Sequence, residues 1–533
     1  MERCKTILFA LLFAGCLSAS AQNRYVVYFT DKNSSTFSIS EPGKFLSPRS
    51  ISRRLKQNID ITAEDLPVNR NYVQQLNTAG AQVFFTSRWL NCALVQTTSD
   101  VATSLNGLPF VARVEYVAPG SKLSSGRTKS NKKRKQSGGA AATKRQLEMV
   151  GIDEMQDDDE YGEGVFIAIL DGGFLGADTA PAFQHLFNDK KITDVHDFVF
   201  NTKNVYRYDE HGTEVFSVIG ANSETFTGGA YEATFQLYVT EDDASEYRIE
   251  EYNWTFAAER ADSLGVDVIH TSLGYSEFDD SSMDYNKNVD LTGKVAIVSK
   301  AAAAALARGI VVVCSAGNEG NNSWGVITPP ADVDGIISVG AVSSQSLRVN
   351  FSSFGPTSDN RYKPDVMAMG SGVSVIKPSG ANGFASGTSL AAPIITSLVA
   401  GLIQRFPDID PNIIAKQVIA TASQADHPDN LMGFGIPNYY AIKSSLEGML
   451  PLEEIAVYPN PTDTGKFSVR FKQPGVQATI TVYDLHGRIL STHTVTVKGN
   501  NPIEIDVADL PASSYLVKVK TSDNFKAFRL VKL

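Results

Sequence analysis

Cysteine is scarce in this sequence. Only four of the 533 residues are cysteines: Cys4 and Cys16 fall near the start, and Cys92 and Cys314 lie far apart in the chain. A disulfide-stapled scaffold is therefore excluded, even in an oxidising compartment. Extreme composition is also absent, because hydrophobic residues make up 43% and charged residues 20% of the chain. These values exclude global disorder, and the length predicts several domains.

A second long apolar run, which a membrane protein would need, is missing as well. The most apolar internal stretch, 295–316, is interrupted by Lys300 and Arg308. It predicts a buried helix followed by a core strand. We therefore expect no integral membrane span once the N-terminal segment described next has been removed.

The first 21 residues have the pattern of an export signal. Arg3 and Lys5 precede an apolar run over 6–17, and Ala-Ser-Ala at 19–21 provides a small-residue cleavage site. The alternative of a membrane anchor is disfavoured because the run is too short to span a bilayer. A lipoprotein attached through Cys16 is a second alternative. The sequence predicts a signal peptide over 1–21.

Charge is divided unevenly along the rest of the chain. Residues 22–145 contain 19 basic and 7 acidic side chains, about +12, whereas 146–533 contain 27 basic and 50 acidic ones, about −23. Two such segments attract each other. Residues 120–145, with Lys-Lys-Arg-Lys at 132–135, predict a basic flexible linker, either a solvated tether or a segment cut during maturation. The basic run is short and lacks interleaved aromatics, so we expect no nucleic-acid partner.

Three structured domains are predicted around this linker. Residues 22–119 mix strands and helices and predict a small α+β module. Residues 146–447 alternate buried strands with helices, which predicts an α/β fold with a mostly parallel sheet covered by helices on both faces. Residues 453–533 contain short strands between turn residues and predict a small β-sandwich. The expected helices are 47–56, 71–79, 99–105 and 301–307, and the expected strands are 24–29, 81–86, 92–96, 111–117, 165–170, 266–271, 310–314, 336–342, 467–471, 478–483, 503–507, 515–520 and 527–531.

Three segments of the α/β region contain residues suited to catalysis. Asp171 ends a buried strand in GVFIAILDGG, His211 precedes a glycine in EHGT, and Ser389 opens a long apolar helix in FASGTSLAAP. Taken singly, each has an ordinary explanation as a turn or cap residue. Together they follow the chain order Asp, His, Ser, one of three unrelated orders in which catalytic triads occur. An α/β-hydrolase is disfavoured because it runs Ser, Asp, His and uses a Gly-x-Ser-x-Gly elbow.

The same strings resemble the subtilisin family. ILDGG, HGT and GTSLAAP are similar to its three active-site motifs, and VDVIHTSLG (266–274) and VCSAGNEG (313–320) resemble its substrate-binding strand and oxyanion-hole loop. The resemblance implies a serine endopeptidase that acts on proteins or peptides. It implies a triad and oxyanion donor formed by Asp171, His211, Ser389 and Asn318, and substrate binding by Ser272, Leu273, Gly274, Ala316 and Gly317.

These roles agree with elementary chemistry. A serine hydroxyl needs a base, and an imidazole such as that of His211 titrates near neutrality. A buried Asp171 would hold the imidazole tautomer and stabilise the imidazolium. The helix N-terminus at Ser389 and the amide of Asn318 would stabilise the negative oxygen of the tetrahedral intermediate. A non-catalytic adhesin on the same scaffold is the alternative, but it would usually lack one of these four residues.

Two positions depart from the family pattern, and the metal question stays open. Glu214 stands where many subtilisins have a second histidine, and Leu390 replaces a methionine often found after the nucleophile. Neither position belongs to the triad. The acidic stretches 157–160 and 279–284 offer oxygen ligands, but they match no defined calcium spacing. No cofactor is expected to be required, no residue is assigned to a metal, and calcium is left open as an additional ligand.

Both flanks also resemble known modules. Residues 24–118 are similar to a subtilisin propeptide, which assists folding and blocks the active site, so the chain's own propeptide is an expected inhibitor. The motifs at 457–462, 482–488 and 510–519 resemble the C-terminal sorting domain of type IX secretion. This resemblance implies the type IX machinery as a partner and a secreted or cell-surface product that crosses the periplasm and outer membrane. A carbohydrate- or protein-binding β-module is the alternative for this domain.

Overall fold

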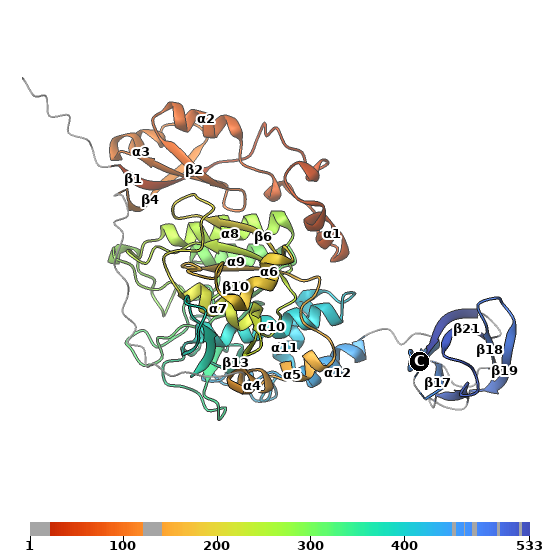
Figure 1. The fold of residues 1–533 in the computed structure, drawn as a ribbon. Coiled ribbons are helices and arrows are strands. Elements are labelled where there is room, and N and C mark those ends of the chain that lie inside the picture. The colour runs from red at the N-terminus through yellow and green to blue at the C-terminus, as the bar shows by residue number, and fades with distance from the viewer. Residues whose placement is uncertain are drawn as a thin grey trace, which may run out of the picture. The chain divides into compact units, whose positions relative to one another are not determined.

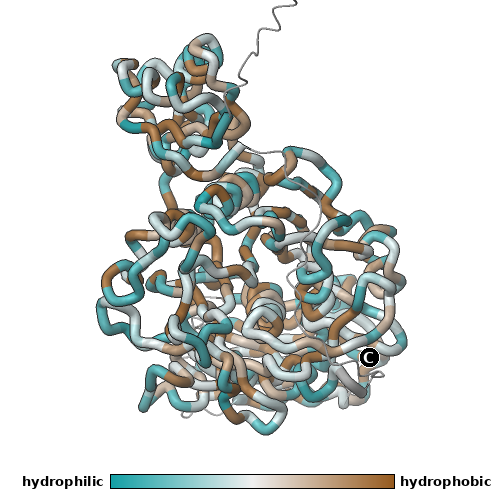
Figure 2. Tube along the Cα trace, turned by 90° about the vertical axis from the view of Figure 1, so that its left-hand side faces the viewer, coloured by the Kyte–Doolittle hydropathy of each residue, from teal (hydrophilic) through white to brown (hydrophobic). Residues whose placement is uncertain are grey.

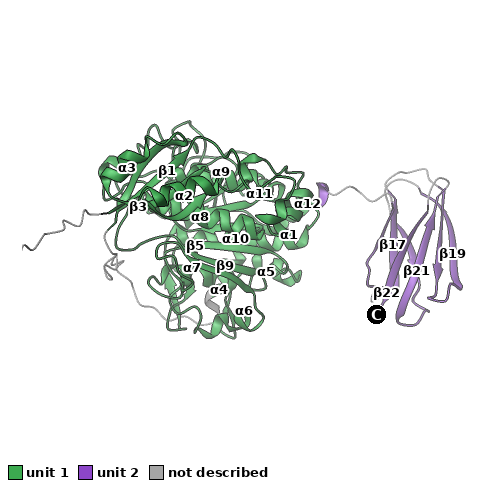
Figure 3. Ribbon diagram, turned by 90° about the horizontal axis from the view of Figure 1, so that it is seen from above, with its two compact units in different colours: residues 1–446 green, residues 447–533 purple. Residues whose placement is uncertain are grey.

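The computed structural model describes residues 22–120, 141–449, 455–462, 464–471, 477–497, 502–521 and 525–533. The predicted signal peptide and most of the predicted linker lie outside these residues. The chain forms two compact units, residues 1–446 and 447–533 (Figure 3). In the described part of the chain, every helix is too short or too polar to cross a membrane.

The first unit begins with a small α+β module (Figure 1). Its four strands form an antiparallel sheet in the order β2-β3-β1-β4, and its helices begin at capped positions, as at Ser47, whose side chain accepts a hydrogen bond from the Ser50 N–H. Helix α3 has the predicted bounds, and the other elements begin and end within one residue of prediction, apart from β4, which ends two residues later. The elements are β1 (Asn23–Phe29), α1 (Pro48–Lys56), α2 (Arg70–Thr78), β2 (Gln82–Ser87), β3 (Cys92–Thr97), α3 (Ser99–Leu105) and β4 (Val111–Pro119).

A seven-stranded parallel sheet forms the centre of the α/β region. Its strand order is β13-β12-β11-β10-β5-β9-β6, and all neighbouring strands in it run parallel. The strands are β5 (Phe166–Asp171), β6 (Ile192–Asp197), β9 (Thr234–Val239), β10 (Val268–Thr271), β11 (Val311–Ser315), β12 (Ile337–Val342) and β13 (Val366–Met369).

Helices cover both faces of this sheet, as predicted. Along β5, Ile167 and Ile169 pack into one hydrophobic cluster, whereas Ala168 and Leu170 pack into the other. Alternation of this kind places a core on each face of a strand. The helices of the first cluster include α7 (His211–Gly220) and α10 (Thr388–Arg405), and those of the second include α8 (Ile249–Leu264) and α9 (Ile297–Ala307). Figure 2 shows hydrophobic segments through the middle of the unit and hydrophilic ones along its outer loops.

The strand order explains where a ligand can bind. From β5 the chain builds β6 and β9 on one side, and then β10 to β13 on the other. The carboxyl ends of β5 and β10 therefore flank the point where the direction of winding reverses, and crevices at such points are the usual ligand sites of open α/β sheets. Asp171 ends β5, and Ser272 follows β10 directly.

The second unit is a two-sheet sandwich of antiparallel strands. One sheet has the order β16-β17-β20 and the other β19-β18-β21-β22, and a single hydrophobic cluster joins their inner faces. Two strands of this unit, β16 and β19, were not predicted. The strands are β16 (Ile455–Tyr458), β17 (Lys466–Phe471), β18 (Gln477–Tyr483), β19 (Ile489–Thr496), β20 (Ile503–Asp506), β21 (Ser513–Lys520) and β22 (Phe525–Lys532).

The boundary of the predicted linker differs from the observed structure at one end. Helix α4 (Ala141–Glu148) begins inside the range 120–145. Thr143 and Gln146 are buried, and Gln146 Oε1 accepts a hydrogen bond of 2.9 Å from the Ser374 N–H. The last residues of this basic segment are therefore packed against the α/β region.

Candidate active site

Asp171 and His211 form the first contact of the site. Asp171 is fully buried at the carboxyl end of β5, and His211 is the first residue of α7. The imidazole Nδ1 lies 2.8 Å from Asp171 Oδ1 and donates its proton to that oxygen. Gly212 is required beside this pair, because a Cβ there would lie 3.0 Å from Asp171 Cβ. The hydrogen bond leaves Nε2 as the nitrogen that can accept a proton.

The environment of His211 favours its protonated form. Burial lowers its pKa, but the charge of Asp171 and its hydrogen bond, with smaller contributions from Asp209 and Glu214, raise the pKa to about 9. Asp209 also accepts a hydrogen bond of 3.1 Å from the His211 backbone N–H, which anchors the start of α7. Carboxylates thus both orient the imidazole and stabilise the cation that forms when it takes a proton.

Ser389 lies in the first turn of α10, 6% exposed. Together with Asp171 and His211 it lines a cleft of about 930 Å³. A Cβ on Gly387, which precedes the helix, would lie 2.8 Å from Ser389 Oγ, so a larger residue there would displace the hydroxyl. Because the N–H groups of a helix's first turn have no intrahelical partner, this turn offers donors and a positive dipole end beside the hydroxyl.

Asn318 faces the same cleft with its amide group oriented. Its Oδ1 accepts hydrogen bonds from the Thr388 backbone N–H at 2.9 Å and from the Thr388 hydroxyl at 3.1 Å. Two donors on this atom identify it as the oxygen. The amide nitrogen is therefore left to donate elsewhere, and Asn318 lines the cleft together with Ser389. Thr388 is a positioning residue that the motif comparison did not single out.

A buried hydrogen-bond chain supports the nucleophile from β10. Each ring nitrogen of His270 forms a hydrogen bond, Nδ1 with Thr396 Oγ1 at 2.7 Å and Nε2 with Ser272 Oγ at 2.9 Å. Ser272 Oγ in turn donates to the Ser389 carbonyl oxygen at 2.8 Å. Burial, with a smaller effect of His211, lowers the pKa of His270 to about 3, so this imidazole is neutral. Ser272 thus ties the predicted substrate strand to the start of α10. Sequence reasoning missed His270 and Thr396 because their contact joins distant segments.

The remaining predicted substrate residues fall into two groups. Leu273 and Gly274 line the cleft with the catalytic side chains, whereas Ala316 is buried at the end of β11. Gly317, at φ +106°, would place a Cβ 3.0 Å from Thr328 Oγ1, and a Cβ on Gly274 would also meet Thr328. Thr328 therefore lies between the two glycines, as a side chain at the base of a pocket would. No sequence signal marked it.

The acidic stretches considered for calcium serve other contacts. Asp158 pairs with Lys443 at 2.5 Å, and Glu160 pairs with Arg405 at 3.5 Å. In the second stretch, Asp280 caps a turn by accepting the Ser282 N–H. Each of these three carboxylates therefore has a partner of its own. Among the described residues, the side chains close enough to share a cation are Asp171, Asp209 and His211, and Glu241, Glu246 and Glu250.

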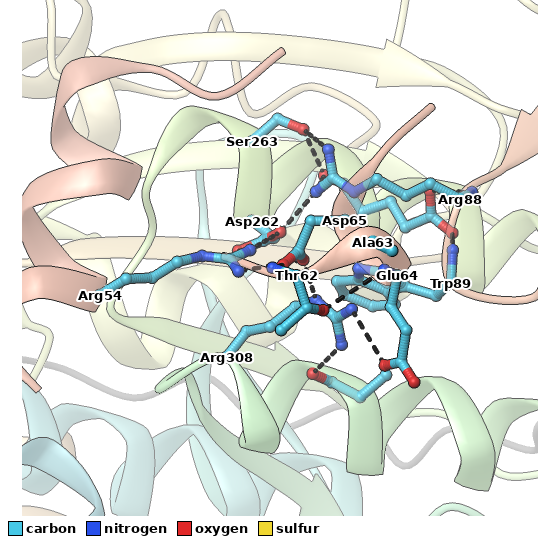
Figure 4. Close-up of polar contacts among 12 residues, drawn as sticks. Arg54, Thr62, Ala63, Glu64, Asp65, Arg88, Trp89, Asp262, Ser263 and Arg308 are labelled. Carbon is cyan, nitrogen blue, oxygen red and sulfur yellow. Dashed lines mark hydrogen bonds and ion pairs between the residues drawn. The ribbon is translucent and has the colours of Figure 1, made fainter. Parts of the chain in front are cut away.

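The α+β module docks on α8 through buried ion pairs (Figure 4). Asp262 of α8 receives three guanidinium groups: Arg53 at 2.5 Å, Arg54 at 2.8 Å, and Arg88. All four side chains are 7% exposed or less. The opposite charges of the two halves of the sequence therefore meet in this interface.

A second set of contacts extends this interface. Arg308, which follows α9, donates to Asp65 of the module at 2.8 Å. Glu259 of α8 accepts hydrogen bonds from the backbone N–H groups of Arg88 and Trp89 at 2.9 and 3.1 Å. Buried charges are tolerated only when they are paired in this way. The module is thus held by a specific polar network in addition to apolar contacts.

Comparison with known proteins agrees with this fold and site. The model of the subtilase family matches residues 162–435, about half of the chain, so the protein belongs to the subtilase family and is a subtilisin-like serine endopeptidase. A propeptide domain of these peptidases from Bacteroidota matches residues 24–137, and a secretion-system C-terminal sorting domain matches residues 456–532. The last match indicates export through type IX secretion, to the cell surface or the extracellular space.

Individual proteins that resemble this chain share about a third of its residues or fewer over the matched regions. Subtilisin DY from Bacillus licheniformis is 28% identical over 283 residues, 52% of this chain and 90% of that protein. A subtilisin from Bacillus pumilus is 31% identical over 255 residues, 46% of this chain and 79% of that protein. The epidermin leader peptide processing serine protease from Staphylococcus aureus superposes with a TM-score of 0.55 at 17% identity, covering 80% of this chain and 99% of that one, which shows a common fold.

Proposed function

We propose that this protein is a secreted endopeptidase that hydrolyses peptide bonds through Asp171, His211 and Ser389 by way of an acyl-enzyme. The observation that carries the proposal is the 2.8 Å hydrogen bond from His211 Nδ1 to the buried Asp171, in the cleft that Ser389 also lines. This arrangement supplies a nucleophile, a base and the group that orients the base.

In the first half of the reaction, Ser389 Oγ bonds to the carbonyl carbon of the peptide while His211 Nε2 takes the hydroxyl proton. The carbonyl oxygen becomes negative and accepts hydrogen bonds from the Asn318 amide and the backbone N–H at the start of α10. When the intermediate collapses, the C–N bond breaks and His211 returns the proton to the leaving amine. An ester of Ser389 remains.

In the second half, water replaces the amine. His211 takes a proton from the water, whose oxygen bonds to the ester carbonyl carbon, and the same donors stabilise the negative oxygen. Collapse breaks the bond to Ser389 Oγ and returns the proton to the serine. Throughout, Ser272, Leu273 and Gly274 would pair with the peptide as a strand, and Gly274, Ala316 and Gly317 would form the pocket for the residue before the scissile bond.

The protein is made as a self-inhibited precursor in this proposal. The buried ion pairs on Asp262 support a module that stays bound to the enzyme until it is released. Removal requires a cut between Gly120 and Gln146, in the basic segment. Calcium is not needed for any step, and the acidic stretches considered for it are used in ion pairs and caps.

Active-site labelling tests the proposal. A fluorophosphonate probe should label the matured protein at Ser389, as located by peptide mass spectrometry, and the labelled protein should no longer hydrolyse casein. Ser389→Ala should lose the label and retain less than about a thousandth of the activity while keeping the catalytic fold. Activity above that level in the variant would show that another residue is the nucleophile.

A further inference from the structure

Three carboxylates form a cluster on one wall of the active-site cleft. Glu241 and Glu246 lie in the segment between β9 and α8, and Glu250 lies in the first turn of α8. One carboxylate oxygen of each residue lies within 4.8 Å of those of the other two. All three line the cleft that contains His211 and Ser389. The proposed mechanism uses none of them.

Two carboxylates of the cluster, those of Glu241 and Glu250, are held by neutral hydrogen-bond donors. Glu250 is 2% exposed; its Oε1 accepts a hydrogen bond of 2.9 Å from the Asp242 N–H, whereas its Oε2 has no hydrogen-bond partner among the described residues. Glu241 Oε1 accepts from Tyr275 Oη at 2.6 Å and from Thr240 Oγ1 at 2.9 Å. Neither Glu241 nor Glu250 forms an ion pair within the described part of the chain. An unsatisfied carboxylate oxygen in such a place calls for a cation.

Electrostatic crowding agrees with this geometry. Burial, and after it the charge of Glu246, raises the pKa of Glu241 to about 8. Burial, and after it the charges of Glu241 and Glu246, raises the pKa of Glu250 well above its usual range. A cation placed among these groups would lower each pKa and gain from two or three carboxylates at once. The site therefore favours a positively charged ligand.

The cluster lies next to the segment proposed to bind the peptide. Tyr275, which donates to Glu241, directly follows Gly274. From there, negative charge continues toward the catalytic centre: a Cβ on Gly172 would lie 3.1 Å from Asp209 Oδ2 and 3.5 Å from Asp243 Oδ1. A peptide paired along 272–274 would thus pass an acidic wall on the side before the scissile bond. That position fits a substrate side chain.

The end of the α+β module lies close to this wall. Strand β4 ends at Pro119, and Pro119 lines a cavity of about 360 Å³ together with Asp242 and Glu250. The sequence then continues with Lys122, three residues after Pro119, and further on with Lys-Lys-Arg-Lys at 132–135. Three extended residues span about 10 Å. The sequence therefore supplies a lysine only a few residues beyond a strand end that shares a cavity with Glu250.

We propose that Glu241, Glu246 and Glu250 form a subsite for a lysine or arginine side chain of the peptide substrate, located before the scissile bond, and that the chain's own basic segment after Gly120 is its first occupant. This inference rests on the proposed peptidase activity of Ser389. The ammonium or guanidinium group would donate to the free Oε2 of Glu250 and to the neighbouring carboxylates. The same wall that recognises substrates would then direct maturation to the basic segment.

Paired peptides test the subsite. A set of fluorogenic peptides places lysine at each of four positions before the scissile bond in turn, and each is compared with the same peptide carrying norleucine, which keeps the length of the side chain without its charge. At one position, matured enzyme should cleave the lysine peptide with a kcat/KM about 10- to 100-fold above that of the norleucine peptide, the range of charge-assisted hydrogen bonds. Glu241→Gln and Glu246→Gln should each reduce that ratio.

Controls separate the possible failures. Glu277→Gln removes an exposed carboxylate that does not line the cleft, and it should leave the ratio unchanged. Equal cleavage of lysine and norleucine peptides at every position, by an enzyme that still reacts with the fluorophosphonate probe, would overturn the subsite and leave the peptidase standing. A protein that neither labels nor cleaves would overturn the proposed function instead. Stabilisation by calcium that Glu246→Gln abolishes, with no lysine preference, would show that the cluster is a metal site and overturn the subsite.

Discussion

Asp262 offers the sharpest test of how the precursor is held in its inhibited state. In Asp262→Ala, three buried guanidinium groups, those of Arg53, Arg54 and Arg88, would lose their common acceptor. Removing one partner of a buried ion pair costs about 3–5 kcal/mol because the other charge stays buried and unpaired. At about 1.4 kcal/mol for each tenfold change in affinity, binding of the α+β module should weaken by about 100- to 4,000-fold.

The assay is inhibition of matured enzyme by separately added module, residues 22–120. The inhibition constant should rise by the stated factor in Asp262→Ala, and salt should change it little because the pairs are 7% exposed or less. Asp189→Ala is the matched control, since Asp189 is exposed and forms no ion pair with a described residue. If the Asp262 variant does not mature, Arg54→Ala in the added module should weaken inhibition of wild-type enzyme.

A small effect would refute this reasoning. If the inhibition constant of Asp262→Ala rose by less than about fivefold, the ion pairs would contribute little to docking. Most of the binding free energy of the module would then come from its apolar contacts, such as Phe85 stacked on Phe256 at 5.3 Å between ring centroids.

Three further predictions concern pH, oxidation and export. His211 acts as a base only when neutral, and its pKa is raised to about 9, so kcat/KM should fall as the pH drops through that value. Asp209→Asn should shift this fall in kcat/KM to lower pH. A pH profile that Asp209→Asn leaves unchanged would contradict the assignment of His211 as the base. Activity should resist peroxide because Leu390 has no sulfur to oxidise, and Leu390→Met should become sensitive; equal inactivation of both would show that the oxidised group lies elsewhere. A chain ending at Ser445 should hydrolyse casein after maturation in vitro but stay in the periplasm of its host, and its appearance in the medium at wild-type levels would exclude the sorting role.

Part of the fold could be predicted because several central strands are short, mostly apolar runs. Strands β5 and β11 are buried on both faces, and both were predicted to within one residue. The edge strands β6 (ITDVHD) and β19 (ILSTHTVT) were not predicted; both are largely polar and partly exposed, so neither shows a hydrophobic pattern. The buried strands β9 (TFQLYV) and β13 (VMAM) were not predicted either. Their positions are set by pairing with a neighbour, which the local sequence does not encode.

Some residues of the candidate site could also be predicted from the sequence, and others could not. The residues proposed for catalysis stand in short motifs at the ends of strands and helices, where local sequence is informative. His270, Thr388 and Thr328 act through contacts between distant segments, and the local sequence does not predict those contacts. The acidic cluster resembles an ordinary solvated loop in the sequence, and only the fold places it inside the cleft.

Helix α8 has a consequence for solubility once the α+β module leaves. Tyr252, which bonds to Tyr28 Oη at 2.6 Å, and Phe256, which stacks on Phe85, would then face water as an apolar patch. Patches of this kind promote self-association. Asp262 and Glu259 lie on the same helix and would be released from their partners at the same moment. The charges that hold the module in the precursor would thus become, in the released enzyme, the charges that keep this surface hydrated and the molecules apart.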